Sequence, residues 1–229
     1  MIRPDDLIAK FQQALNDGWG YIWGTAGELW TASKQKAATR PMTVQYGSQW
    51  IGKKVADCSG LFAWAFKELG GFMYHGSDTM YRKYCTSKGV LNKGKRTDGQ
   101  ELLPGTAVFT YNENDKKYGH VGLYVGGGKV IEAAGTREGV ITSNVNGKWE
   151  NWGELKGVEY QSAPIPSGYA RVTGKNVALR KDPSAQAKIL TRIPTGNTVK
   201  LETPPPSEWD YVSYQGKSGW MMKEFLKEG

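Results

Sequence analysis

A change in sequence character near residues 161–168, "QSAPIPSG", constrains the fold of this chain more than any other feature. Two prolines, two serines and a glycine without periodic apolar residues are typical of a linker. Helical and strand patterns mix before this stretch, whereas only short strand-like runs follow it. We therefore predict an α+β domain over residues 1–160, a linker over 161–169 and a small all-β domain over 170–229.

The final sixty residues contain five strand-like runs separated by turn residues. The runs are "NVALR", "ILTRI", "TVKLE", "WDYVSY" and "SGWMM", and the turns include "DPSA", "PTGN" and "QGKSG". Short strands at this spacing predict a small barrel that folds on its own.

Composition limits the chemistry that the chain can perform. Its two cysteines, Cys58 and Cys85, are too few for a disulfide framework, so each is a core residue, a ligand or a nucleophile. With two histidines and no CxxC pair, the sequence lacks a metal-binding pattern, and we expect no metal or other cofactor.

The positive charge is spread evenly along the chain. The net charge is +8, with 20 basic and 16 acidic residues over 1–169 and 10 and 6 over 170–229. Such a surface attracts polyanions in general, and a phosphate-rich bacterial wall is one of them. No recognition helix or aromatic-basic stripe favours nucleic acid.

The N-terminal residues have helical periodicity, with Leu7, Ile8, Phe11 and Leu15 on one face. They lack the order of a signal peptide, and no run is long enough to span a bilayer. We expect a monomer made in the cytoplasm, for which an extracellular role requires another exit route.

The stretch "ADCSGLFAWAFKELGG", residues 56–71, places a cysteine directly before a helix-like run. The apolar spacing predicts a buried helix over residues 59–69, with Asp57 as its N-cap. Cys58 then falls in the first turn, where the helix dipole favours a thiolate. Ser59 and Gly60 leave room for a substrate, although a buried core cysteine is the alternative.

A nucleophilic cysteine needs a base, and the chain offers two histidines. His75 lies in "MYHGSD", a loop-like stretch with no orienting partner in sight, whereas His120 begins the predicted hairpin "YGHVGLYVGGGKVIEAAG". An odd-numbered loop at Gly126–Gly128 would bring His120 and Glu132 to one face, with Gly122 opposite Glu132. A two-residue loop would separate them, and Glu132 would then be an exposed hairpin residue.

The order of "DCSGL", "LLPGTAVF" and "GHVGLYVGGGKVIEA" resembles the NlpC-type cysteine peptidases, papain-like endopeptidases of bacterial peptidoglycan. The resemblance covers roughly residues 5–160 and implies a helix with the nucleophile, packed on an antiparallel sheet with the base. By this match Cys58 is the nucleophile, His120 the general base and Glu132 the residue that orients the histidine.

The same resemblance implies a substrate groove. The stretch "YIWGTAG" is similar to the family's aromatic-glycine motif. The match places Tyr21, Trp23, Asp57 and Ser59 along the groove.

The chain departs from the family pattern at three places. Glu132 stands where histidine is more typical, and a carboxylate can fill that role. Thr106 replaces the usual aspartate at what we interpret as a structural turn. An insertion between residues 28 and 54, with spacing similar to that of phage-type lysins, forms either a wall of the groove or a surface loop.

Residues 170–227 resemble a bacterial SH3-like domain, a small barrel that tethers wall hydrolases to peptidoglycan. Trp209, Tyr211 and Trp220 are the aromatic residues of interest there. Packing in the core is the alternative explanation for them.

Three functions compete at this stage. The first is a peptidoglycan endopeptidase that cleaves after D-γ-glutamyl and before the diamino acid, with a lysin-like role in phage release. The second is another Cys-His acyl-transfer enzyme, such as an N-acetylmuramoyl-L-alanine amidase or a transpeptidase. The third is a non-catalytic wall-binding protein. Cys58, His120 and a third partner favour the first, with peptide stems and the anionic wall as partners.

Overall fold

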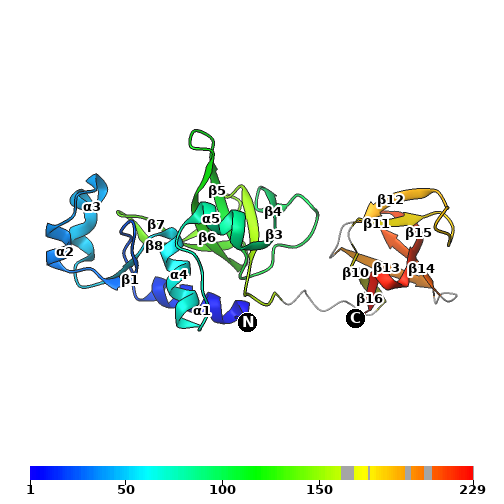
Figure 1. Ribbon diagram of the computed structural model, residues 1–229, viewed down its shortest axis with the longest axis horizontal. Helices are drawn as coiled ribbons and strands as arrows, with labels where there is room; N and C mark the ends of the chain where they lie inside the picture. Colours follow the sequence, from blue (N-terminus) through cyan, green and yellow to red (C-terminus); the bar gives the residue numbers. More distant parts are fainter. Residues whose placement is uncertain (161–167, 175, 194–196, 204–207, 229) are drawn as a thin grey trace. The chain divides into compact units, whose positions relative to one another are not determined.

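The computed structural model describes residues 1–160, 168–174, 176–193, 197–203 and 208–228. The chain divides into two compact units, Met1–Tyr160 and Gln161–Gly229, each with its own sheet and hydrophobic core (Figure 1). Most of the predicted linker lies outside the described residues. Tyr169, which we placed at the end of that linker, is instead the first residue of a strand, β10 (Tyr169–Val172).

The first unit combines helices with an antiparallel sheet, which confirms the predicted mixed fold. Its helices are α1 (Pro4–Asn16), α2 (Ala32–Lys36), α3 (Pro41–Tyr46), the 3-10 helix η1 (Gly47–Trp50), α4 (Cys58–Glu68) and α5 (Ser77–Tyr84). Strands β1 (Ala26–Leu29) and β2 (Lys54–Ala56) pair with each other. The larger sheet has the order β4-β3-β9-β5-β6-β7-β8. Its strands are β3 (Cys85–Asn92), β4 (Lys95–Arg96), β5 (Ala107–Asn112), β6 (Lys117–Gly126), β7 (Lys129–Gly135), β8 (Gly139–Asn144) and β9 (Asn151–Leu155).

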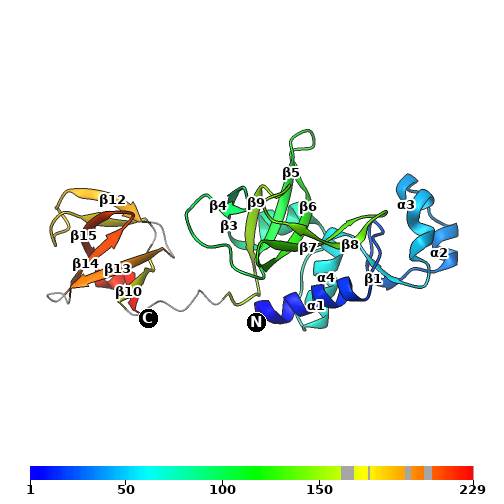
Figure 2. The same cartoon turned by 180° about the vertical axis from the view of Figure 1, so that it is seen from behind.

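Helices α1, α4 and α5 pack against one face of this sheet (Figure 2). The predicted apolar stripe of α4 is buried, and its Phe62 ring meets Phe11 of α1 at a centroid distance of 4.7 Å. Val121 and Leu123 of β6 complete this core from the sheet side. Burial of such side chains stabilises the fold by about 1.5–3 kcal/mol each, so α4 is firmly fixed against β6.

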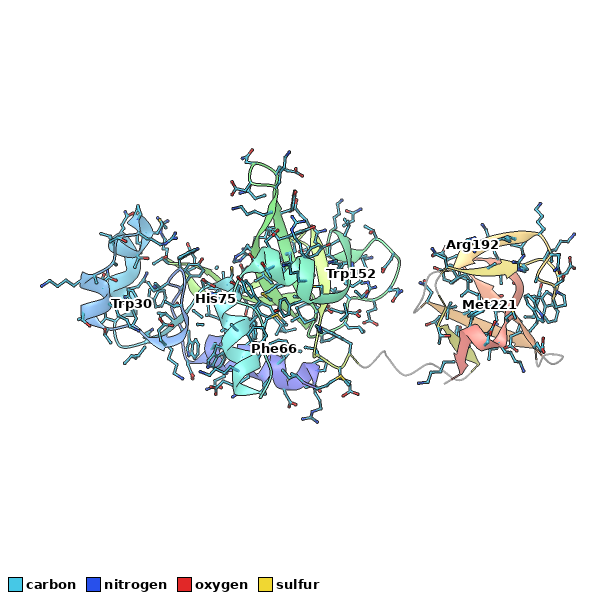
Figure 3. The ribbon with its side chains drawn as sticks, viewed as in Figure 1. Trp30, Phe66, His75, Trp152, Arg192 and Met221 are labelled. Atoms are coloured by element: carbon cyan, nitrogen blue, oxygen red, sulfur yellow. The ribbon has the colours of Figure 1, made fainter. Side chains whose placement is uncertain are left out.

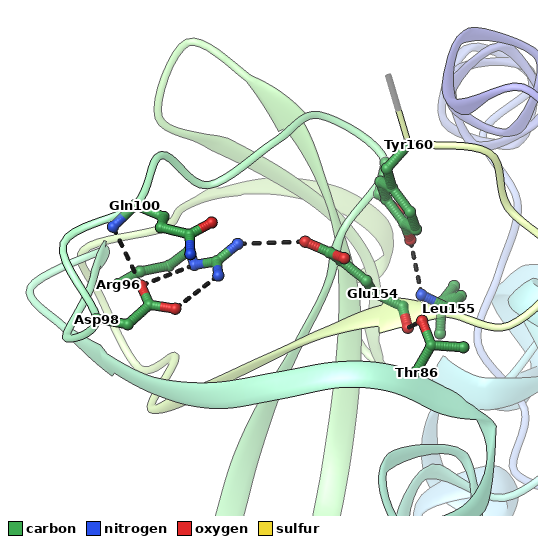
Figure 4. A network of polar contacts seen from close by, with 8 residues as sticks. Thr86, Arg96, Asp98, Gln100, Glu154, Leu155 and Tyr160 are labelled. Carbon is green, nitrogen blue, oxygen red and sulfur yellow. Dashed lines mark hydrogen bonds and ion pairs between the residues drawn. The ribbon is translucent and has the colours of Figure 1, made fainter. Parts of the chain in front are cut away.

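The opposite face of the sheet carries a second apolar cluster that includes Trp149 and Trp152. Arg96 stacks on Trp152, with its guanidinium carbon 3.5 Å from the ring centroid. The same side chain is nearly buried and pairs with Asp98 and Glu154 (Figure 4). These contacts cover the far face at β9, where Trp152 is buried, whereas most residues of β3 stay exposed.

The insertion at residues 28–54 has a small core of its own. Trp30 and Trp50 are buried there with Ile22 and Val55. The Trp50 indole N–H donates to the carbonyl of Thr136, between β7 and β8, at 2.6 Å. The insertion is therefore a folded element attached to the sheet, with α2 and α3 projecting at one end of the unit (Figure 1).

The second unit is an antiparallel sheet with the strand order β12-β11-β15-β14-β13-β10-β16. The five predicted runs correspond to β11 (Val177–Arg180), β12 (Ile189–Ile193), β13 (Thr198–Thr203), β14 (Trp209–Tyr214) and β15 (Lys217–Met222). The short 3-10 helix η2 (Lys223–Phe225) leads into β16 (Leu226–Glu228).

The aromatic residues of interest in this unit lie outside its hydrophobic core cluster. Trp209, Tyr211 and Trp220 are half-buried, and the rings of Tyr211 and Trp220 are 5.1 Å apart. Core packing thus does not account for them. Across the described residues of both units, no helix has the length and apolar character needed to cross a bilayer.

Candidate active site

Asp57 caps the helix that carries the cysteine, as predicted. Its Oδ1 accepts the backbone N–H of Gly60 at 2.7 Å and the Ser59 hydroxyl at 3.1 Å. Helix α4 begins at Cys58, one residue earlier than we expected. The N-cap thus places the thiol at the first helical position.

The aromatic-glycine motif is attached to the same aspartate. The backbone N–H of Gly24 donates to Asp57 Oδ2 at 2.8 Å. Gly60 allows this close packing, because a Cβ there would lie 1.9 Å from the carbonyl oxygen of Thr25. Tyr21 and Trp23 are held beside the start of α4 as a result.

The Cys58 thiol is buried, with a residue exposure of 8 %. Burial, and then the charge of Asp57, raise the pKa of Cys58 to about 12, although the backbone amides of Val121, Ser59 and Cys58 itself act in the opposite direction. The backbone amides at the helix start favour the thiolate as expected, but burial outweighs them. A base must take the proton, and Val121 directly follows His120 on β6.

Strands β6 and β7 form the predicted hairpin in the predicted register. Leu123 lies opposite Ile131 and Tyr124 opposite Val130. The turn differs from our expectation, because Gly126 pairs with Lys129 and leaves two residues between them. The register shifts by one residue between Tyr124 and Gly126, as in a β-bulge. This shift gives the two-residue turn the same strand register that an odd-numbered loop would produce.

His120 and Glu132 meet across this hairpin, and the geometric expectation is confirmed. His120 Nε2 and Glu132 Oε2 are 2.5 Å apart, and the carboxylate side chain is fully buried. Burial alone would raise the pKa of Glu132, but hydrogen bonds from His120 and Lys148 outweigh it and lower the pKa to about 2. Glu132 is thus ionised at any pH near neutrality.

Two further residues at this pair escaped the sequence reasoning. Lys148 donates to Glu132 Oε2 at 2.5 Å, and Trp149 stacks on the His120 ring with centroids 5.5 Å apart and planes at 16°. Gly122 makes room for Trp149, since a Cβ there would lie 2.7 Å from the indole. The signal was the basic-aromatic pair in "GKWE" just before β9.

His75 has an orienting partner, contrary to our reading of its loop. Its Nε2 lies 2.8 Å from Asp57 Oδ2, close to the N-terminal end of α4 (Figure 3). This hydrogen bond raises the pKa of His75. Burial acts to raise the pKa of Asp57, but the contacts with His75, Gly60 and Gly24 outweigh it, and the net shift is downward.

A cleft of about 570 Å³ opens beside the thiol. All four predicted groove residues lie along it, together with the nucleophile and His75; they are Tyr21, Trp23, Asp57, Ser59, Cys58 and His75. His120 does not line this cleft, but its neighbours Tyr118 and Gly119 do. The structure thus joins the groove residues to Cys58, and the strand that carries His120 reaches the cleft through Tyr118 and Gly119.

The protonation of His120 follows from its contact. An ionised carboxylate only accepts hydrogen bonds, so Nε2 carries the proton that points to Glu132. In the neutral imidazole the other nitrogen, Nδ1, then has a free lone pair and can accept a proton. Among the described residues, no group of three or more His, Cys, Asp and Glu side chains could hold a metal ion.

A cysteine at a helix start, packed on an antiparallel sheet that presents a histidine–carboxylate pair, defines the papain-like class of thiol enzyme. The sequence profile of the NlpC/P60 family matches residues 33–153, just over half of the chain. The chain belongs to the NlpC/P60 family, whose members are cysteine peptidases that act on peptidoglycan. The matched segment contains Cys58, His120 and Glu132, but not Tyr21 or Trp23.

Two curated proteins are similar to part of the chain. A probable endopeptidase p60 of Listeria grayi is 28% identical over 123 residues, 54% of this chain and 20% of that protein. A peptidoglycan DL-endopeptidase, CwlO, of Bacillus licheniformis is 29% identical over 102 residues, 44% of this chain and 20% of that protein. The aligned part is thus about a fifth of the length of these relatives.

Solved structures with a similar arrangement include the peptidoglycan hydrolase RipB of Mycobacterium tuberculosis. It is 23% identical, with a TM-score of 0.44, over 69% of this chain and 65% of that one. The P60 domain of antigen MAP1204 from M. avium subspecies paratuberculosis is 22% identical, with a TM-score of 0.43, over 69% of this chain and 96% of that one.

Proposed function

We propose that this protein is a peptidoglycan endopeptidase that hydrolyses a peptide-stem amide, namely the bond between D-γ-glutamyl and the diamino acid. The observation that carries the proposal is the hydrogen bond of His120 to the buried Glu132, on strands packed against the helix that begins with Cys58. Family membership supports it, as does the similarity to a protein named a DL-endopeptidase.

The chemistry uses the groups already described. Nδ1 of His120 accepts the proton of the Cys58 thiol, and the sulfur attacks the stem carbonyl carbon to form a tetrahedral intermediate. The C–N bond then breaks as the imidazolium gives its proton to the leaving amine, and an acyl-enzyme remains. His120 next removes a proton from water as the water oxygen attacks the thioester carbon. The C–S bond then breaks, the acid leaves, and the imidazolium returns its proton to the Cys58 sulfur. Glu132 stabilises the imidazolium in both halves of the reaction.

The decisive experiment replaces each cysteine in turn. Cys58→Ala should abolish the release of soluble fragments from purified sacculi, because no other side chain is proposed to form the acyl-enzyme. Cys85→Ala should retain most of the activity, because its thiol packs against Gly153 and Cys85 does not line the cleft. Equal lysis by wild type and the Cys58 variant would overturn the proposal.

Mass spectrometry of the released fragments separates the competing activities. New N-termini at the diamino acid support the endopeptidase. Fragments that separate the glycan from intact stems would instead identify an N-acetylmuramoyl-L-alanine amidase, and products joined to a new amine would identify a transpeptidase. Wall binding without any fragments would identify a non-catalytic wall protein.

The second unit serves, in our proposal, as an SH3-like wall anchor in a lysin-like protein that reaches the wall after phage-type release. Its exposed positive charge and its half-buried aromatic residues outside the core support this role. A chain ended after Gly168 should still cleave soluble muropeptides but sediment less with sacculi. Equal sedimentation of both chains would exclude anchoring, and loss of cleavage of soluble fragments would assign the unit a part in building the groove.

A further inference from the structure

Arg40 of the insertion stacks on a residue that lines the active-site cleft. It immediately precedes α3, and its guanidinium carbon is 3.3 Å from the ring centroid of Trp23. Trp23 is 57% exposed and lines the cleft that contains Cys58. The insertion therefore brings a charged group next to the cleft wall through this stack.

The guanidinium of Arg40 has no acidic partner among the described residues. No ion pair or hydrogen bond of the described chain uses its side chain, whereas Arg82 pairs with Asp78 and Arg96 with Asp98. Stacking on an indole uses the face of the guanidinium and leaves its N–H edge available. The arrangement leaves a preoriented cation without a counter-ion.

The charge of Arg40 reaches the interior of the cleft. Burial, followed by the charges of Cys58 and Asp57, raises the pKa of Tyr21, and Arg40 is the group that acts in the opposite direction. Tyr21 lines the cleft beside the thiol. An anionic group on a bound substrate would experience the same attraction, strengthened by partial exclusion of water.

We propose that Arg40, held flat on Trp23, binds a free carboxylate of the peptide stem and so makes the enzyme selective for stems that are not amidated. This inference rests on the proposed endopeptidase function. A planar guanidinium matches a carboxylate with two parallel N–H donors, and this charge-assisted contact is lost when the carboxylate becomes a neutral amide. Two stem carboxylates offer this chemistry, that of the glutamyl residue and that of the diamino acid.

The test compares three soluble stem peptides: one with both carboxylates free, one amidated at the glutamyl carboxylate and one amidated at the diamino acid. We expect wild type to lose about tenfold in kcat/KM for one of the amidated peptides, which identifies the bound group. Arg40→Gln should lose a similar factor on the free peptide and treat it and that amidated peptide alike. Arg40→Lys, which keeps the charge without the planar fork, should fall between them.

Arg137→Gln is the matched control. Arg137 also stacks on an aromatic residue of the insertion, Tyr46, but neither residue lines the cleft. This variant should keep the wild-type preference. Equal kcat/KM of wild type for all three peptides overturns this inference alone, as does an unchanged preference in a folded Arg40→Gln. Failure of wild type to cleave any of them overturns the proposed function as well.

Discussion

The first unit contains two histidine–carboxylate pairs. The pair His75–Asp57 and the pair His120–Glu132 have contacts of 2.8 and 2.5 Å, so the distance alone does not distinguish them. The two pairs differ in the other hydrogen bonds that each carboxylate accepts. Asp57 Oδ1 accepts from Gly60 and Ser59, and Oδ2 accepts from Gly24 as well as from His75.

Asp57 therefore fixes the start of α4 and the backbone at Gly24 through these hydrogen bonds. His75 is an additional partner, with a third of its side chain exposed. No backbone N–H of the described residues donates to the carboxylate of Glu132. This fully buried carboxylate accepts from the side chains of His120 and Lys148. A histidine beside a carboxylate is therefore a better candidate for the base when that carboxylate accepts few other hydrogen bonds. Its charge is then available to stabilise the imidazolium.

The largest expected difference separates the two histidines. His120→Ala should lower kcat by about two to four orders of magnitude, because it removes the proposed base. His75→Ala should retain at least a tenth of wild-type activity. Single-turnover rates on soluble muropeptides, with circular dichroism to verify folding, provide the measurement. A greater loss in the His75 variant would exchange the roles that we assign to the two pairs.

The next effect concerns the carboxylate of the His120 pair. Glu132→Gln keeps the size and can still accept a hydrogen bond, but it removes the charge that favours imidazolium. We expect a loss on the order of tenfold or more, with Ala lower still. Glu132→His should restore part of the activity, since histidine is the more typical residue at this position in the family.

Wild-type rates in folded Gln and Ala variants would show that Glu132 is dispensable. The next candidate for the third position would then be the polar side chain of Asn144, at the end of β8. Its Oδ1 accepts from Lys129 at 2.9 Å, however, so that side chain is already engaged on the hairpin. Lys148 is the polar residue that actually contacts the pair.

The sequence predicted those parts of the site that depend on local periodicity. The apolar stripe of α4, the Asp57 cap and the alternation along β6 and β7 each specify one element, and the register then brings His120 to Glu132. Contacts between residues far apart in the chain left no such pattern. The His75–Asp57 bond and the Arg40–Trp23 stack require the tertiary fold.

The turn between β6 and β7 illustrates a second limit. We inferred the loop length from the register, and the register was right while the loop was wrong, because a bulge compensated for the missing loop residue. Gly126, Gly127 and Gly128 all have positive φ, so the glycine run permits several turn geometries that end in the same pairing.

A smaller effect tests whether Glu132 divides its charge between two partners. Lys148→Met removes the cation beside Glu132, so the full carboxylate charge is left to stabilise the His120 imidazolium. We expect kcat/KM on soluble muropeptides to change by less than the roughly tenfold expected for Glu132→Gln, because the half-exposed ammonium of Lys148 is partly screened by water.

The matched control for that change is Lys129→Met, which makes the same change in net charge but contacts Asn144 instead of Glu132. Its kcat/KM should equal that of wild type at about 0.15 M salt, where remote surface charges are screened. An equal change in both variants, or a loss in Lys148→Met as large as that in Glu132→Gln, would contradict the division of charge.

The smallest expected effect is on stability and concerns the other pair. The pKa of Asp57 is lowered in the fold, so its contribution is present above its unfolded pKa and is lost as the pH falls through the folded value. The pKa of His75 is raised, so its contribution is complete below about 6.5 and is lost as the pH rises through the folded value. The two conditions overlap between about pH 4 and 6.5. Within that window His75→Gln should destabilise the protein by about 1 kcal/mol or less, given the exposure of the ring. Thermal unfolding of both proteins from pH 4 to 9 should show the difference in midpoint shrinking above about pH 7. A difference that grows with pH would mean that His75 acts in its neutral form, and the contrast drawn between the two pairs would then fail.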